Sequence, residues 1–540
     1  MQNQVGNYEI SEEKIEKKLS NLLKTPGLDK ILELTYAYKS TYKINGRNIY
    51  FNKDIFETFL GKDFPEKPEL SQEDFKELER TIREKTIKII NEFNSILKEL
   101  IVNDELNYSK KEIIMNAINY NITLLQYFLN SLIFELKKAG YKKYLTKTQI
   151  KFIVTKNEEY EKVLYGGKVI DNEEEALRCY DYMITESEKN KYKITPERYN
   201  ELQKYLAKIK NELESRGYDV GMKFIYNKKE NKETKDFRDT FGKAEIDRET
   251  YMQIFDMIFE SLGLRQRTRL ASAGSVYDGP DFLDIPDNDK FAKLPLDRIL
   301  KLVTHEVLGH YISQRNHEKY FGDIRGEGNV EKDEGMAMLL ESIMHRGEDI
   351  FSVNPVSPEF TTLFAGEILK SDEYLKFIDI YGDVTRKLTT NEARFIRYKR
   401  NQPINGVGVQ HKDTTYIRGL LKIIDYLKSG GDIFKLINGK FGIKDITSGK
   451  IDFSQNKDFL ITFFIVDIII YKVLLKQKII TGKLNKESFK DFLKRKYYYL
   501  GIDFDSMLND ISKEQKLIVN KVFKVIANKI KSTQYLNPQS

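Results

Sequence analysis

The sequence predicts an α+β fold that is mainly helical, with a small mixed sheet in the middle of the chain and helical regions on both sides. Apolar residues recur every three or four positions from Ser11 to about Lys143, as in Ile87, Ile90, Phe93, Ile96 and Leu97. Short extended runs appear only after Gly140. Because 540 residues exceed one ordinary core, we expect three regions: 1–145, 146–430 and 431–540.

Helices and strands are expected to alternate in the middle region. The runs 149–154 and 220–226 are typical of strands, and the segment Glu173–Arg216 between them is typical of a helix. A further extended run, Asp281–Ile285, precedes a proline that should end it. We expect this run to be a sheet edge that can pair with a peptide backbone.

Two strong helices are expected next. Pro295 suits the first turn of a helix whose apolar periodicity continues past His310. A second helix should begin near Lys332 and end near Gly347, with an apolar face formed by Met336, Leu339, Leu340 and Ile343. After about Gly430 the pattern is helical again, to near Ser532.

Composition favours a globular protein of a reducing compartment. The net charge of +7 arises from 89 basic and 82 acidic residues without a long basic tract, which argues against a nucleic-acid partner. The single cysteine, Cys179, and the polar first ten residues predict a cytoplasmic protein. The apolar segment 459–475 contains Asp467 and Lys472 and is shorter than the ~20 residues of a spanning helix, so no membrane partner is expected.

All five histidines fall between positions 305 and 411. This confinement suggests a site, although chance clustering explains it equally well. The run His305-Glu306-Val307-Leu308-Gly309-His310 resembles the zinc peptidase motif H-E-x-x-H with one residue more. On a regular α-helix, residues five apart differ by roughly 140° in direction and cannot share an ion. A π-bulge would bring both histidines to one face, and Gly309 would supply backbone freedom there.

A catalytic zinc ion usually has three protein ligands and one open position. The helix expected after Lys332 carries Glu334, Glu341 and His345 along one stripe. Such a stripe can also be plain solvent exposure. As a group facing two histidines, it favours Glu334 as the third ligand of one zinc ion, with Glu341 or His345 orienting the histidines.

Three blocks of sequence resemble the tubulin tyrosine carboxypeptidase family of zinc peptidases. They are the six-residue motif, Glu334-Gly335-Met336-Ala337, and a basic block of Arg397-Tyr398-Lys399-Arg400 followed by Lys412–Gly419. The resemblance covers about residues 151–427, and the glycine of the first motif lies one position later than in the family pattern. It implies a zincin-like catalytic region in which His305, His310 and Glu334 hold zinc and Glu306 is the general base.

The resemblance implies a carboxypeptidase that acts on a protein or peptide C-terminus, such as a C-terminal tyrosine or another aromatic residue. Tubulin is a substrate only if the host has it. The oxyanion of the reaction needs a second donor, for which Tyr416 and His411 are candidates. A cationic side chain should hold the terminal carboxylate; the candidates are Arg397, Lys399, Arg400 and Arg418, with His411 also near the substrate.

Other interpretations remain open. An aminopeptidase or an endopeptidase would share the metal core and differ in how the substrate ends are held. A zinc-containing binding protein without catalysis is a further alternative, but it has no need for a base such as Glu306. A helical scaffold without metal is the simplest alternative.

Overall fold

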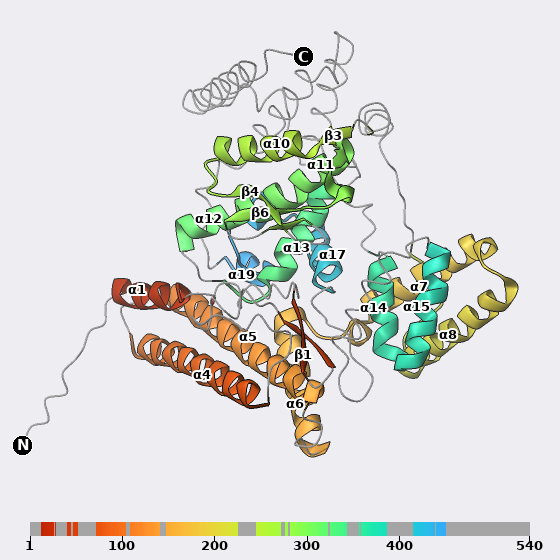
Figure 1. The fold of residues 1–540 in the computed structure, drawn as a ribbon, viewed down its shortest axis with the longest axis horizontal. Helices are drawn as coiled ribbons and strands as arrows, with labels where there is room; N and C mark the ends of the chain where they lie inside the picture. The colour runs from red at the N-terminus through yellow and green to blue at the C-terminus, as the bar shows by residue number, and fades with distance from the viewer. Residues whose placement is uncertain are drawn as a thin grey trace, which may run out of the picture.

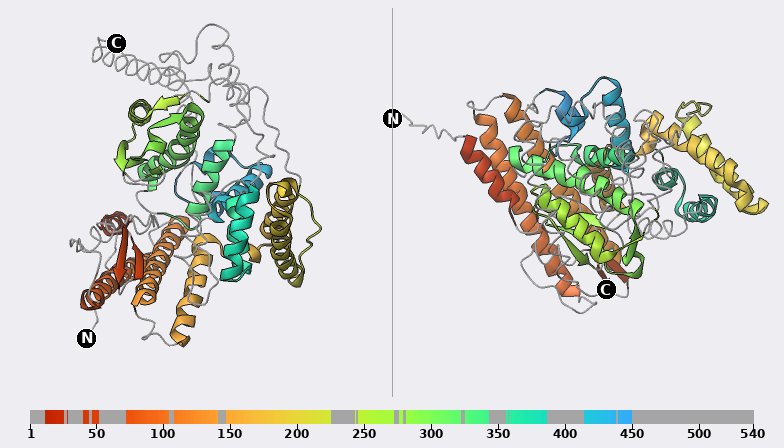
Figure 2. Two further views of the ribbon diagram at one scale, coloured as in Figure 1. Left: turned by 45° about the vertical axis from the view of Figure 1, so that its right-hand side comes forward. Right: turned by 90° about the horizontal axis from the view of Figure 1, so that it is seen from above.

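The computed structural model describes the chain in segments. They are residues 12–25, 28, 40–44, 47–51, 72–103, 108–140, 147–224, 243, 245–271, 276–278, 281–321, 325–342, 356, 358–385, 414–437 and 439–449. The described residues are mostly helical with three small sheets, which confirms the expected mainly helical α+β class. The elements fall into the three groups described below, whose ribbons are drawn in Figures 1 and 2. The buried apolar side chains form three clusters, one for each group.

The N-terminal elements are helices, whose side chains form the first cluster, and one hairpin, which corrects the prediction of a helical pattern throughout this region. They are α1 (Glu12–Leu23), β1 (Ser40–Ile44), β2 (Arg47–Phe51), α4 (Gln72–Val102), α5 (Tyr108–Gly140) and α6 (Lys147–Tyr165). The periodic residues Ile89, Phe93 and Ile96 of α4 are buried, as expected of an amphipathic helix. The predicted strand 149–154 is wrong, because these residues form the first turns of α6. A short apolar run does not by itself distinguish a strand from a helix.

The second cluster joins two pairs of helices from distant parts of the chain. They are α7 (Glu173–Asn190), α8 (Pro196–Ser215), α14 (Pro358–Ile368) and α15 (Ser371–Thr385). The helix predicted over 173–216 is broken where Thr195 caps α8 and Pro196 begins it. The strand predicted over 220–226 is wrong for its described part. There Phe224 donates its N–H to the Asp181 carboxylate and not to a neighbouring strand.

Small sheets lie over the third cluster. Antiparallel β3 (Glu245–Asp247) and β7 (Lys293–Pro295) flank α10 (Arg248–Ser261). The other sheet has the order β4 (Arg267–Ala271), β6 (Phe282–Pro286), β5 (Tyr277–Asp278). The strand predicted at 281–285 is confirmed and ends at Pro286, but its assignment to a sheet edge is wrong. β6 is the central strand, parallel to β4 and antiparallel to β5.

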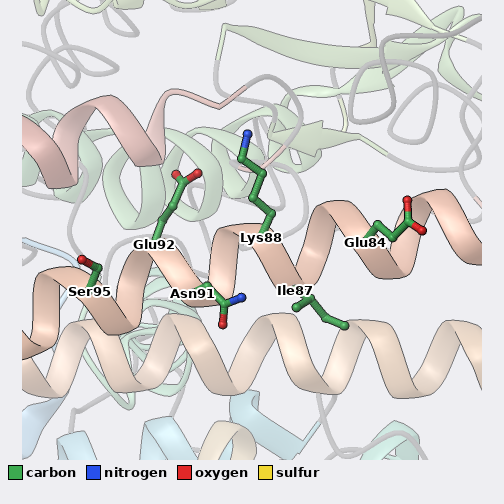
Figure 3. Close-up of a pocket in the computed structure, with 6 residues that line it drawn as sticks. All are labelled: Glu84, Ile87, Lys88, Asn91, Glu92 and Ser95. Atoms are coloured by element: carbon green, nitrogen blue, oxygen red, sulfur yellow. The ribbon is translucent and has the colours of Figure 1, made fainter.

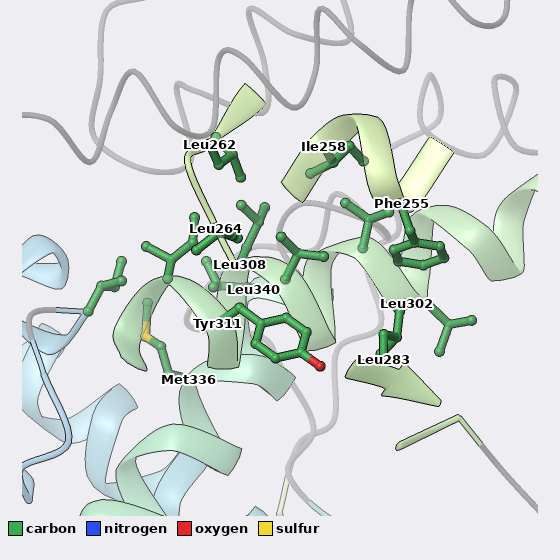
Figure 4. Packing of buried hydrophobic residues seen from close by; sticks show 14 of the residues in the cluster. Phe255, Ile258, Leu262, Leu264, Leu283, Leu302, Leu308, Tyr311, Met336 and Leu340 are labelled. Carbon is green, nitrogen blue, oxygen red and sulfur yellow. The ribbon is translucent and has the colours of Figure 1, made fainter. Parts of the chain in front are cut away.

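One continuous helical rod follows β7 and crosses the third cluster. It consists of α11 (Leu296–Leu302), the π-helix η4 (Val303–Tyr311) and α12 (Ile312–Phe321). The helix predicted from Lys332 is α13 (Asn329–Leu340) and begins three residues earlier. Figure 4 shows Leu308 and Tyr311 of the rod packed with Met336 and Leu340 of α13. Pro295 precedes α11 as its N-cap residue.

The described part of the chain ends with α17 (Thr415–Lys428), α18 (Ile433–Leu436) and α19 (Ile443–Thr447). Residues 450–540 lie outside the described residues, so the C-terminal helical region and the apolar segment 459–475 remain predictions. Within the described ranges, none of the helices combines the length and the apolar character needed to cross a bilayer.

Two glycines let α13 and α17 touch backbone to backbone. A methyl group on Gly335 would overlap the backbone of Gly419 and Leu420, and one on Gly419 would overlap the carbonyl oxygen of Glu331. Small residues at a helix crossing allow this approach because they remove the side chains that normally separate the axes. The position of α13, and of every side chain on it, therefore depends on α17.

We expect Gly419→Ala to destabilise the fold, because the added methyl group forces the two helices apart. Overpacking of this kind typically costs about 1–3 kcal/mol. Thermal unfolding followed by circular dichroism measures the effect. Gly221→Ala is the matched control, since its added methyl group would meet only the Asp219 side-chain oxygen at 3.1 Å. Equal unfolding midpoints in both variants would contradict this account of the crossing.

Candidate metal centre

The two histidines of the six-residue motif lie side by side, as the π-bulge hypothesis requires. Residues 303–311 form a π-helix, in which residues five apart come close to the same face. The rings of His305 and His310 meet edge to face, with centroids 5.3 Å apart. The extra residue of the motif is therefore absorbed by the backbone, and the distortion predicted from the sequence is confirmed.

Glu334 of α13 completes a triad with these histidines. Its Oε2 atom lies 3.8 Å from Nε2 of His305 and 3.5 Å from Nε2 of His310. One ligand atom from each side chain falls within 4.8 Å of the other two. The two oxygen–nitrogen distances of 3.8 and 3.5 Å exceed the about 2.7–3.2 Å of an ordinary N–H···O hydrogen bond. They are close to ~3.3 Å, the edge of a tetrahedron with metal–ligand bonds of about 2.0–2.1 Å.

The triad is largely shielded from solvent. Side-chain exposure is 19% for His305, 9% for His310 and 14% for Glu334. A carboxylate and two imidazoles at such burial form a donor set for a borderline divalent ion. The observed residues therefore fit a single metal ion of the zinc type, with both histidines offering Nε2.

Glu341 supports His305 from behind. Its Oε2 atom lies 3.7 Å from Nδ1 of His305, and its Oε1 atom forms an ion pair of 2.8 Å with Lys301. Burial lowers the pKa of His305, but the carboxylates of Glu341 and Glu306 outweigh burial, and the net pKa is raised. At 3.7 Å this contact is longer than a hydrogen bond, but a carboxylate facing Nδ1 still favours a proton on that nitrogen and leaves Nε2 for a metal ion. Of the two residues predicted to orient a histidine, Glu341 lies beside His305 and His345 is outside the described residues, whereas Lys301 gave no signal in the sequence.

Gly309 is needed for close approach. Its backbone is helical, and an added Cβ would lie 2.6 Å from Cβ and 2.9 Å from Cα of Ala337 on α13. The prediction that Gly309 supplies conformational freedom is therefore wrong. Glycine is required there because a larger residue would overlap Ala337. Ala337, the last residue of the Glu334–Ala337 block, is the small partner that this approach requires.

The rod and α13 run antiparallel and meet at every fourth residue. His305 lies opposite Glu341, Gly309 opposite Ala337, and the Ser313 hydroxyl donates to the Asp333 carboxylate at 3.2 Å. Glu334 follows the last of these contacts directly in sequence. The contacts between the two helices thus fix the position of Glu334 along the rod.

The two predicted catalytic residues lie on the rod and on α17. Glu306 follows the first histidine and is partly exposed. Tyr416 lies in the first turn of α17 and is also partly exposed. The antiparallel crossing of α17 and α13 turns the start of α17 toward the C-terminal half of α13, where Glu341 lies.

Arg418 has a structural role that differs from the predicted one. Its guanidinium is buried, holds Glu175 of α7 through two nitrogens, and donates to the carbonyl oxygens of Tyr165 and Gly167. These bonds use the guanidinium N–H groups that would otherwise bind a substrate carboxylate. Arg397, Lys399, Arg400, His411 and His345 lie outside the described residues, so their roles remain predictions.

A shallow hollow on the N-terminal helices is unrelated to the triad. It follows one side of α4 and is lined by Glu84, Ile87, Lys88, Asn91, Glu92 and Ser95 (Figure 3). These residues include no member of the triad and no histidine. The hollow therefore contributes nothing to the metal centre.

Comparisons of the chain with protein-family models, curated proteins and solved structures give no match. The functional argument consequently rests on the residues and geometry of the triad.

We expect Glu341→Gln to weaken zinc binding by about 10–100-fold, the usual effect of removing the carboxylate behind a histidine ligand. Competition with a fluorescent chelator measures the affinity. Glu318→Gln on α12 removes a partly exposed carboxylate that pairs with Arg265, and it should leave the affinity unchanged. An unaltered zinc affinity in Glu341→Gln would show that His305 needs no such support.

Proposed function

We propose that this protein is a zinc-dependent metallopeptidase. The observation that carries the proposal is the π-helix, which places His305 and His310 beside Glu334. A π-helix is rare and concentrates at functional sites. A scaffold without metal has no evident use for this distortion in its core.

The ligand set supports catalysis better than a purely structural site. Structural zinc sites are usually closed by four protein ligands, whereas catalytic sites use three and keep one position open. Among the described residues, the candidate group contains three side chains. A zinc ion held there would supply a Lewis acid that polarises a carbonyl group and acidifies a water molecule.

The residues of the chain divide the remaining work. Glu306 follows the candidate ligand His305 and is partly exposed, so we assign it the role of taking a proton from water and returning it to the leaving amine. Tyr416 is the candidate hydrogen-bond donor to the tetrahedral oxyanion. Glu341 and Lys301 keep His305 oriented.

The sheet offers a place for the substrate backbone. The hydroxyl of Tyr311 donates to the Phe282 carbonyl of β6 at 3.3 Å, and β5 also contacts the π-helix. β5 is the outer strand of this sheet on that side. A peptide added along β5 would run beside the histidine helix, which is the arrangement expected of a zincin-like region.

Within this class we favour a carboxypeptidase related to the tubulin tyrosine carboxypeptidase family. The structure describes two of the three blocks and the end of the third: the rod carries both histidines, α13 carries Glu334, and Gly419 packs against α13. The proposed substrate is the C-terminus of a protein or peptide in the cytoplasm, with a C-terminal tyrosine or another aromatic residue as the first choice. Its carboxylate would be held by Arg397, Lys399 or Arg400, since Arg418 is engaged elsewhere.

An aminopeptidase or endopeptidase would use the same centre, and a zinc-containing binding protein would use only the ligands. The presence of Glu306 directly after His305, together with a candidate group of three ligands, favours catalysis over binding alone.

Zinc content and peptide cleavage, measured on wild type and Glu306→Gln, test the proposal. We expect one zinc ion per chain in both proteins and a loss of cleavage of about 10²–10⁴-fold or more in the variant, because only the base is removed. Glu318→Gln should cleave like wild type. Cleavage of C-terminal residues from a peptide library distinguishes a carboxypeptidase from the alternatives. A wild-type protein without zinc would refute the proposal.

A further inference from the structure

A group of buried charges lies next to the triad and is not used by the mechanism above. Lys332 is completely buried, and Asp333 and Lys440 are 5% and 7% exposed. Lys332 and Asp333 belong to α13, whereas Lys440 comes from the segment before α19. Taking three charges out of water is unfavourable unless each has close partners.

Each oxygen of the Asp333 carboxylate has a cationic partner. Oδ1 lies 2.7 Å from the ammonium of Lys332, and Oδ2 accepts from the ammonium of Lys440. Lys332 also donates to the Ser313 hydroxyl at 3.1 Å and to the carbonyl oxygen of Gly439. Burial alone would raise the pKa of Asp333, but the two lysines hold it well below its usual value.

The cluster joins three segments at the metal ligands. Asp333 directly precedes Glu334, and its partner Ser313 lies one helical turn after His310. The Ser313 hydroxyl is also 3.2 Å from the carbonyl oxygen of Gly439. A shift of α13 along the rod would break these contacts and move Glu334 away from His310.

The backbone of Lys440 is fixed as well as its side chain. Its N–H donates to Nδ1 of His317 at 3.0 Å, and its carbonyl oxygen accepts from Gly326 at 2.9 Å. Lys440 therefore has little freedom to follow Asp333 if α13 moves. Its ammonium acts as a fixed reference point for the carboxylate.

We propose that Lys440, together with Ser313, is a positioning residue of the metal centre that sets where Glu334 stands relative to His310. The inference rests on the proposed zinc site. Buried ion clusters are weak contributors to stability, and replacing them by apolar groups is often neutral. Their best-attested use is to fix the register of packed helices.

Geometry and charge predict opposite effects when Lys440 is neutralised. The cluster has two cations and one anion, so it repels a metal ion nearby. Removing one cation should tighten zinc binding if charge alone mattered. If the role is positional, Lys440→Met should weaken binding instead, because the Asp333 carboxylate loses its fixed partner and α13 its register.

The experiment measures zinc affinity by chelator competition and the visible spectrum of the cobalt-substituted protein, which reports ligand geometry. It compares the full-length wild type, Lys440→Met and Ser313→Ala. Lys422→Met is the matched control: it removes the ion pair between Lys422 of α17, which is 51% exposed, and Glu331 of α13, so it also takes one lysine from an acidic residue of α13. Ser313→Ala keeps all three charges paired and serves as the readout if Lys440→Met does not fold.

We expect zinc affinity to fall about tenfold in Lys440→Met, as for other supports of metal ligands. The cobalt spectrum should change, a smaller fall should occur in Ser313→Ala, and Lys422→Met should match wild type. Unchanged or tighter binding with an unchanged spectrum in the two cluster variants would overturn this inference while leaving the zinc site intact. A wild-type protein that binds neither zinc nor cobalt would overturn the metal centre itself, and this inference with it.

Discussion

The close approach of α13 to two other helices is the constraint on which the candidate metal centre depends. Gly309 and Ala337 bring α13 against the histidine rod, and Gly335 and Gly419 bring it against α17. Because neither contact has room for another methyl group, α13 is held at a fixed distance on two sides. Glu334 lies between Gly335 and the Ser313–Asp333 contact, so its position is fixed together with that of α13.

The π-helix is the second feature that brings the three side chains of the triad together. Lengthening the histidine spacing by one residue would separate the ligands on an α-helix, and the wider turn restores their common face. The wider turn also spans the position of Gly309, where an added Cβ would lie 2.6 Å from Cβ of Ala337 on α13. Backbone distortion and tight packing therefore occur at one place, and each side chain of the triad comes from a rigid helix.

Polar contacts lie at both ends of the close contact between the rod and α13. Lys301 and Glu341 support His305 at one end, and Lys332, Asp333 and Lys440 occupy the other. Farther out, the Arg418–Glu175 pair ties α17 to α7, so the cluster containing the triad is linked to its neighbour. This arrangement explains why α13 has buried residues on every side, including charged ones.

The sequence by itself determined the mainly helical class, the histidine helix, the π-bulge and Glu334 as the candidate third member of the triad. Each follows from a spacing along one or two helices, which is a local property. The strands predicted at 149–154 and 220–226 were wrong in their described parts. The sequence also did not reveal the central place of β6 or the structural role of Arg418. Tertiary structure decided these features, because pairing partners and burial depend on residues far away in the chain. The partners of Lys332 and Lys440 were likewise invisible: a charged residue on a helix suggests solvent, and only packing on every side shows that it is buried.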